Sequence, residues 1–235
     1  MLLSLEKLYP WSEGLPALLS DYCEEVFTKE EYENIQDFFA ETDFYTAPAS
    51  TRFHLSCPQG LMTHTLNVVK AAHALIYDEI AIDNQVTAFH DMWVKLIKCA
   101  ILHDICKVDS YKAAPFNFKE YAPDGDKSDA FGTFKWSQGI RYNYDVNFDL
   151  GHGSKSIFIA EAWGITLSKE EAQAIYYHMG DFHNMPETSK VFAENRLALL
   201  LHMADLYASS ALDLSAEESQ KYASDCIQKN PELFQ

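Results

Sequence analysis

Two neighbouring side chains, His103 and Asp104, interrupt the apolar stretch KCAILHDICKVD at residues 98–109. Burying an imidazole without a hydrogen bond costs free energy, and burying a carboxylate without a neutralising charge costs far more. A bound metal ion would neutralise Asp104 and would give both side chains a partner. The pair therefore predicts a metal site, although this segment taken alone fits a hydrogen-bonded core pair equally well.

Three later segments carry further metal-type ligands in apolar surroundings. His152 stands between two glycines at a predicted helix start, His178 ends an apolar helix, and Asp205 lies within the apolar run LALLLHMADLY. Each alone is more often a core residue than a ligand, but four helices bearing such residues are less easily a coincidence. Imidazole and carboxylate without a thiolate pattern favour Mn²⁺, Fe, Co, Ni or Mg²⁺ with open positions for water over a closed zinc site.

Helical geometry separates the other candidate histidines. His64 and His73 are nine residues apart, which is about half a turn beyond whole turns, so at most one of them serves a given site. A second pair, His90–Asp91, would lie about 20 Å from His103 on a continuous helix, too far to share a metal. We expect His90 and Asp91 to be structural.

These residues must be positioned by a mainly α fold. Residues 15–40 predict two short helices, with a capping box formed by Thr28 and Glu31 between them. Residues 41–60 predict a loop. Apolar periodicity predicts the remaining helices at 61–80, 86–107, 152–164, 168–179, 194–212 and 215–228.

Residues 110–149 differ from the rest, because they are rich in aromatic residues, Gly, Pro and Asp. Short alternating runs such as RYNYDV predict a hairpin or an ordered loop. A segment of this length without helices is more often functional than idle. One hypothesis is a wall or lid whose aromatic side chains, Trp136 among them, stack on a nucleobase. The alternative is a hairpin packed against the core or a partner subunit.

His64, His103–Asp104 and Asp205, in this order, resemble the pattern of the HD-domain metal-dependent phosphohydrolase superfamily. GLMTHTLNVV is similar to the family's first-histidine helix, and ILHDICK is similar to its LLHDIGK signature. GHGSKS, HMG and LHMADLYAS resemble motifs of subgroups with extra histidines, which include the HD module of bacterial 3′–5′ exoribonucleases and the HD-GYP phosphodiesterases. The resemblance covers roughly residues 52–212, which makes residues 1–50 an N-terminal helical extension of a single domain spanning 1–235.

The resemblance implies a divalent metal centre of one or two ions that activates water for phosphoester hydrolysis. It implies a first metal held by His64, His103, Asp104 and Asp205, and a second held by Asp104, His152 and His178. Lys107 would lie near the substrate phosphate, where its charge would assist the transition state. Arg52 and His54, just before the first metal helix, are candidate substrate contacts.

The chain departs from the extra-histidine pattern at His178–Met179, where those subgroups often have two consecutive histidines. The second metal is therefore expected to be weaker, absent, or helped by Asp181 or His183.

We expect a phosphohydrolase acting on a nucleotide or another small phosphorylated substrate. The alternatives are a phosphodiesterase or 3′–5′ exonuclease on short oligonucleotides, and a non-catalytic nucleotide-sensing HD module. The HD-GYP loop is missing, which counts against a cyclic-dinucleotide phosphodiesterase. No OB-type domain precedes the HD module, and the net charge of −17 disfavours long nucleic acid as a partner.

Composition favours a cytoplasmic protein. No apolar run approaches the ~18–20 residues of a membrane span, and the first residues make a poor signal peptide. The five cysteines have no metal-binding spacing, and we expect Cys99 and Cys106 to be core residues of a reduced protein. The sequence leaves open whether the chain forms oligomers.

Overall fold

The computed structural model describes residues 7–83, 86–145, 148–180 and 187–229, which form a mainly α protein, as predicted. The helices are α1 (Leu15–Val26), α2 (Lys29–Glu41), α3 (Gly60–Asp83), α4 (Val86–Leu102), α5 (His152–Ala162), α6 (Lys169–Tyr177), α7 (Thr188–Glu194), α8 (Arg196–Tyr207) and α9 (Ala216–Lys229). A 3₁₀ turn, η1 (Ile105–Lys107), follows α4, and a π-helical segment, η3 (Ala208–Leu212), follows α8.

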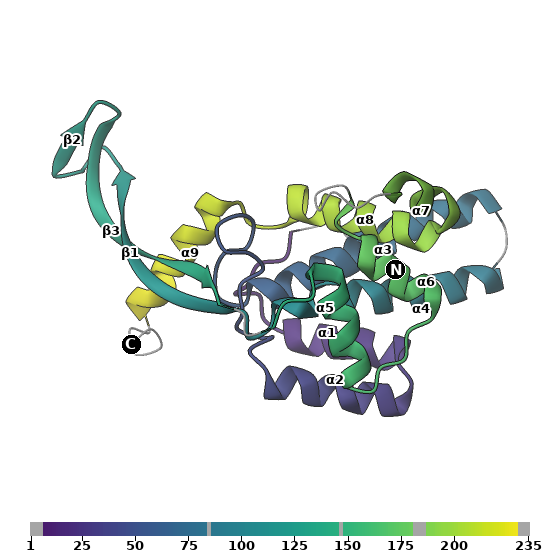
Figure 1. The fold of residues 1–235 in the computed structure, drawn as a ribbon. Coiled ribbons are helices and arrows are strands. Elements are labelled where there is room, and N and C mark those ends of the chain that lie inside the picture. Colours follow the sequence, from purple (N-terminus) through teal and green to yellow (C-terminus); the bar gives the residue numbers. More distant parts are fainter. Residues whose placement is uncertain (1–6, 84–85, 146–147, 181–186, 230–235) are drawn as a thin grey trace.

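The helix α3 runs through the middle of the core and packs against α4 and α8 (Figure 1). All its residues from Gly60 to Ala72 are buried. Leu66 and Val69 belong to the main core cluster, together with Ile97 of α4. A buried helix is expected to be apolar on all sides, so the polar His64 within this stretch needs a partner.

Capping boxes start two of the helices. The predicted box at Thr28 and Glu31 is present at the start of α2, and Ser168 and Glu171 form another at the start of α6. In each box the hydroxyl accepts the N3 amide while the glutamate accepts the N-cap amide, which satisfies two orphan donors.

Within the segment 110–149, the residues from Tyr111 to Tyr144 form a hairpin, which is one of the two structures predicted for that segment. Strand β1 (Tyr111–Tyr121) pairs antiparallel with β3 (Gly132–Tyr144), and the short β2 (Lys127–Asp129) pairs with β3 near the tip. This ribbon, which we call the arm, extends away from the helical body alongside α9 (Figure 1). Tyr111 is paired with Tyr144 at its base, and Lys119 with Trp136 further out.

One edge of the arm is covered by a helix, and the other is open among the described residues. Next to the base, α9 covers the outer edge of β3: Ser224 Oγ donates to the Gln138 carbonyl at 2.6 Å and Gln220 Nε2 to the Ile140 carbonyl at 2.9 Å. In the described part of the chain, the other edge of β1 has no paired strand. Pro115 lies midway along that edge.

Several predicted helix boundaries were wrong, and the important one is at α4. The predicted helix 86–107 ends at Leu102, so His103 and Asp104 lie in a turn. The side chain of Ser156 causes the break, because its Oγ donates to the His103 carbonyl at 2.7 Å and accepts from the Cys106 amide at 3.2 Å. A continuing helix would use both backbone groups itself.

The predicted helix 194–212 is also interrupted. Asn195 ends α7 and caps α8, because its side chain accepts from the Ala198 amide. The helix then widens into η3 before Asp213. The predicted helix 168–179 ends at Tyr177, which makes His178 its C-cap residue.

Among the described helices, none is by itself both long and apolar enough to cross a membrane. The segments Arg196–Leu212 and Ala216–Cys226 reach that length and apolar composition only when taken together, and they are bent by 66° relative to each other.

Candidate metal centre

The structure brings all six predicted metal ligands into one cluster. His64 comes from α3, Asp205 from α8, and the others from the turns and helix ends around them: His103, Asp104, His152 and His178. The last four lie where helices begin or end, so the breaks in the predicted helices are what lets these side chains converge.

Asp104 lies at the centre of the cluster and is 2% exposed. Its Oδ2 is 3.4 Å from the Nε2 atoms of both His64 and His103. Its Oδ1 is 2.6 Å from His152 Nε2 and 3.7 Å from His178 Nε2. The two carboxylate oxygens thus face two separate pairs of imidazoles, which is the arrangement that a carboxylate shared between two ions requires.

Four groups of donor atoms in the described residues are compact enough to hold a metal ion, with all ligand atoms within 4.8 Å of one another. They are His64, His103 and Asp104; His103, His178 and Asp205; Asp104, Cys106 and His152; and His54, His64 and Asp213. The first three groups share members and together contain every predicted ligand.

Hydrogen bonds to the far side of the rings fix how three imidazoles face the centre. His103 Nδ1 donates to the Ala100 carbonyl at 2.8 Å, and His178 Nδ1 donates to the Ile175 carbonyl at 2.6 Å. His64 Nδ1 lies 2.7 Å from Asp213 Oδ2. With the proton on Nδ1, each Nε2 presents a lone pair to the cluster, as a metal-binding histidine does.

His178 provides the clearest test of whether the site fits a metal. The ring is completely buried, and its Nε2 has no hydrogen-bond partner. Burial, together with neighbouring His103 and His152, lowers the pKa of His178 to about 3. The ring is therefore neutral, and an unsatisfied buried acceptor is unfavourable. A cation at the centre would satisfy it.

The charge of the cluster points the same way. In the described part of the chain, the carboxylates Asp104, Asp205 and Asp213 surround His64, and Lys107 forms an ion pair with one of them, Asp104. Burial favours the neutral ring, but these carboxylates raise the pKa of His64 well above its usual value, so a proton on Nε2 balances them when no ion is bound, and a cation at the centre would take the place of that proton. Buried carboxylates in excess of permanent cations require a counter-charge, and a divalent ion would supply it.

Asp213 was not predicted from the sequence, yet it organises one side of the centre. Its Oδ2 accepts from His54 Nδ1 and His64 Nδ1, both at 2.7 Å, and its Oδ1 accepts from Asn67 Nδ2 at 2.8 Å. Burial raises the pKa of this carboxyl, but His64 and His54 lower it overall. An aspartate following a helix is common, so the sequence offers no distinctive signal for this role.

The predicted substrate contacts divide into two kinds. Lys107 Nζ is 2.5 Å from Asp104 Oδ2, and both Lys107 and His54 line a cavity of about 460 Å³ that reaches the centre. Burial opposes the charged form of Lys107, but the Asp104 carboxylate raises its pKa overall. Arg52 is exposed, lies over the ring of Phe53, and is not among the lining residues of that cavity.

The remaining candidates lie away from the centre. The rings of His73 and His90 both contact Trp93, and neither residue belongs to a metal-binding group in the described residues. This agrees with the opposite facing of His64 and His73 and with a structural role for His90. The predicted helpers of a second metal, Asp181 and His183, lie outside the described residues.

Cys106 was expected to be a core residue; it is buried as expected, but it also contacts the centre. Its Sγ lies 3.4 Å from His152 Nδ1 and 3.8 Å from His152 Nε2. The turn at η1, which the sequence did not predict, directs the side chain toward the centre rather than into the apolar core.

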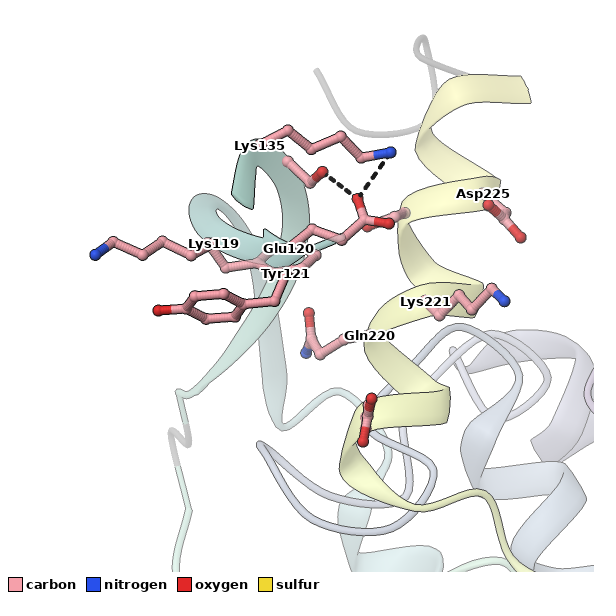
Figure 2. A pocket seen from close by; sticks show the side chains of 11 residues that line it. Lys119, Glu120, Tyr121, Lys135, Gln220, Lys221 and Asp225 are labelled. Atoms are coloured by element: carbon pink, nitrogen blue, oxygen red, sulfur yellow. Dashed lines mark hydrogen bonds and ion pairs between the residues drawn. The ribbon is translucent and has the colours of Figure 1, made fainter. Parts of the chain in front are cut away.

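A larger pocket lies elsewhere, between the arm and α9 (Figure 2). It measures about 750 Å³, and across the two strands Glu120 forms an ion pair with Lys135 and accepts a hydrogen bond from Ser137 Oγ. None of its lining residues is a histidine or cysteine. We therefore place the chemistry at the buried cluster and not at this pocket.

No family model, curated protein or solved structure matches the chain. The helical body with its cluster of histidines and aspartates is compatible with an HD-type fold and able to bind a metal ion.

Proposed function

We propose that the protein is a metal-dependent phosphohydrolase that cleaves a phosphoester bond of a nucleotide or another small phosphorylated substrate. The observation that carries the proposal is the buried Asp104, whose two oxygens each face two imidazoles while Lys107 stands beside it on the cavity wall. The resemblance to HD phosphohydrolases supports the same function.

The chain's own residues would divide the work. A divalent ion held by the cluster would make a water more acidic and polarise a phosphoryl oxygen. Asp104 and the imidazoles would hold the ion, and Asp213 fixes the orientation of His64. Lys107 brings a permanent positive charge to the cavity wall, where it would attract the phosphate and stabilise charge in the transition state.

His54 is suited to a different contact from the one a cation would make. Burial lowers its pKa despite the opposing effect of Asp213, so the ring is neutral. Its Nδ1 proton is donated to Asp213, which leaves Nε2 as an acceptor. His54 would therefore receive a hydroxyl of the substrate or a water, and Lys107 would be the residue that meets the phosphate.

The size of the cavity supports a small substrate. Sites for small molecules are usually about 300–1,000 Å³, and the cavity beside the centre falls within this range at about 460 Å³. Apolar side chains, Phe53, Met179 and Leu206, line it alongside the polar residues.

The proposal is tested by metal content and turnover in the same preparations. The purified protein should carry transition metal and, with Mn²⁺, hydrolyse members of a panel of aryl phosphate esters, mononucleotides and short oligonucleotides. Asp104→Ala should lose both metal and turnover, whereas His90→Ala should retain both. Unchanged metal content in Asp104→Ala would refute the site. Nucleotide binding without turnover in a metal-loaded protein would instead indicate a sensing module.

A further inference from the structure

Cys106 lies against the His152 side of the centre, although its sequence context gave no reason to expect this. Its side chain is 3% exposed, and its Sγ contacts the His152 ring at 3.4 and 3.8 Å. We propose that Cys106 is a thiolate ligand of the second metal position. This inference rests on the proposed function in that it assumes a metal centre.

Three different donor atoms meet at this position. Asp104, Cys106 and His152 each bring a ligand atom within 4.8 Å of the other two, and His152 Nε2 is only 2.6 Å from Asp104 Oδ1. In the described part of the chain, no other cysteine belongs to such a group.

A second observation points to a ligand at the same place. His178 Nε2 is buried, lacks a hydrogen-bond partner, and lies 3.7 Å from the same Oδ1 of Asp104. An ion bound by Asp104, Cys106 and His152 would also satisfy this orphaned atom. The sulfur would thereby supply the donor that a second histidine at Met179 would otherwise have given.

The thiolate makes the two halves of the centre chemically unlike. The half formed by His64, His103 and Asp104 offers nitrogen and oxygen only. The half with Cys106 adds sulfur, a soft donor that favours Zn²⁺, Co²⁺ or Fe²⁺ over Mn²⁺ and Mg²⁺. When the sulfur–metal bond forms, the Cys106 thiol releases its proton to the solvent.

The test is a titration of the metal-free full-length chain with Co²⁺, followed by absorption spectroscopy. Cobalt bound to a thiolate gives a sulfur-to-cobalt charge-transfer band in the near ultraviolet, which nitrogen and oxygen ligands do not give. Wild type and Cys99→Ser should show the band, because Cys99 is buried outside the metal-binding groups. Cys106→Ser and Cys106→Ala should lack it. Their Co²⁺ affinity in this half should fall at least tenfold, about the lower bound for losing even an outer-shell partner.

The outcomes separate this inference from the proposed function. Cobalt bound to the wild type without a charge-transfer band would overturn the thiolate ligand and leave the phosphohydrolase intact; Cys106 and His152 would then share only a hydrogen bond. A band that persists in both Cys106 variants would overturn it as well. A wild type that binds no cobalt would refute the metal centre itself. The wild-type spectrum decides even if one variant fails to fold.

Discussion

At the scale of single residues, Asp213 controls the centre without being one of the predicted ligands. It holds His54 and His64 through the same oxygen and Asn67 through the other. Partners of this kind keep a histidine's proton on the far nitrogen and orient the ring for the metal. Asp213 is therefore expected to affect metal binding although it is not one of the predicted ligands.

Asp213→Asn should weaken metal binding about 10- to 100-fold, the usual cost of losing an outer-shell partner. The amide keeps the size of the carboxylate but can no longer accept two N–H groups at one charged oxygen. Calorimetric titration with Mn²⁺ measures the effect, and Asp91→Asn, at an exposed site on α4, is the control. An unchanged affinity in Asp213→Asn would mean that His64 is oriented by its other neighbours.

Two unequal Mn²⁺ affinities are expected in the wild type. One ion would have four nitrogen and oxygen donors, from His64, His103, Asp104 and Asp205, whereas the other position would have His152, His178 and a share of Asp104. Titration of metal-free protein should show one tight event and one weak or absent event, and His152→Ala should remove only the weak one. Two equally tight Mn²⁺ events would contradict this division.

The sequence indicated the candidate ligands better than it indicated their supports. The apolar surroundings of His103, Asp104, His152, His178 and Asp205 marked these residues, and the resemblance to HD phosphohydrolases added His64. Asp213 and Cys106 escaped, because their roles depend on where η1 and η3 turn the chain. Ser156, whose hydroxyl ends α4, acts from a helix about fifty residues away, and local patterns do not carry such long-range contacts.

At the scale of the elements, a buried ion pair joins α2 to α4. Glu31 Oε1 accepts from Lys98 Nζ at 2.9 Å and from the Thr166 amide at 2.9 Å, while Oε2 accepts from the Thr28 amide. One carboxylate thus closes a capping box and bridges three parts of the helical body. The sequence predicted the capping box but not the ion pair, because Lys98 is distant in the chain.

Glu31→Ala should destabilise the protein by about 3–5 kcal/mol, the range for leaving one partner of a buried pair uncompensated. Denaturant unfolding measures the loss. Glu30→Ala, in the same turn of α2 but exposed, should cost less than about 1 kcal/mol. Equal effects of the two changes would show that the Lys98 contact contributes nothing.

The same pair predicts a dependence of stability on pH. Burial alone would raise the pKa of Glu31, but Lys98 and the Thr28 and Thr166 amides lower it overall. A lowered folded-state pKa means that the contribution to stability is present above the unfolded-state pKa and is lost as the pH falls through the folded value. The free energy of unfolding should therefore fall less between neutral and acidic pH for Glu31→Gln than for wild type, as denaturant unfolding at several pH values would measure. Equal decreases in the two proteins would contradict the assignment.

The geometry of the arm limits the lid hypothesis to the aromatic residues at the base of the arm. Trp136 pairs with Lys119, eight positions along β1 from Tyr111, or roughly 26 Å at 3.3 Å per residue. Tyr144, paired with Tyr111, lines a separate cavity of about 470 Å³ on the His152 side of the centre, distinct from the cavity lined by Lys107 and His54. The aromatic side chains that lie beside the centre are thus those at the base and not Trp136.

Tyr144→Ala should raise the KM for a nucleotide about 5- to 150-fold, because stacking on one base contributes about that factor to affinity. Hydrolysis of an aryl phosphate should stay nearly unchanged. Trp136→Ala is the matched control, because the two side chains are similarly exposed at 56% and 52%. Equal losses on both substrates in Tyr144→Ala would assign the tyrosine to the structure of the site.

At the scale of the whole molecule, charge separates small substrates from polymers. The chain carries 35 acidic and 18 basic side chains, giving a net charge of −17. A phosphate at the centre would meet Lys107 and the bound cation, whereas a long strand would also cross the acidic surface.

Long single-stranded RNA should therefore show no saturable binding at physiological salt, even to the metal-loaded protein. Gel-shift titration with a long strand and with a dinucleotide compares the two cases. Tight binding of the long strand that weakens steeply with salt would reveal a basic track and favour an exonuclease.

The open edge of β1 has a consequence for how concentrated solutions of this protein behave. Ser110 and Asp145 are hydrogen-bonded across the start of the ribbon, as are Ala122 and Thr133 across its far end. Because bonded and non-bonded pairs alternate in an antiparallel ribbon, the odd-numbered residues of β1 point their amides outward. Pro115 is one of them and has no amide proton to offer. A strand of a neighbouring chain that paired with this edge would lack one hydrogen-bond donor at Pro115. Pro115 therefore disfavours edge-to-edge association through the arm.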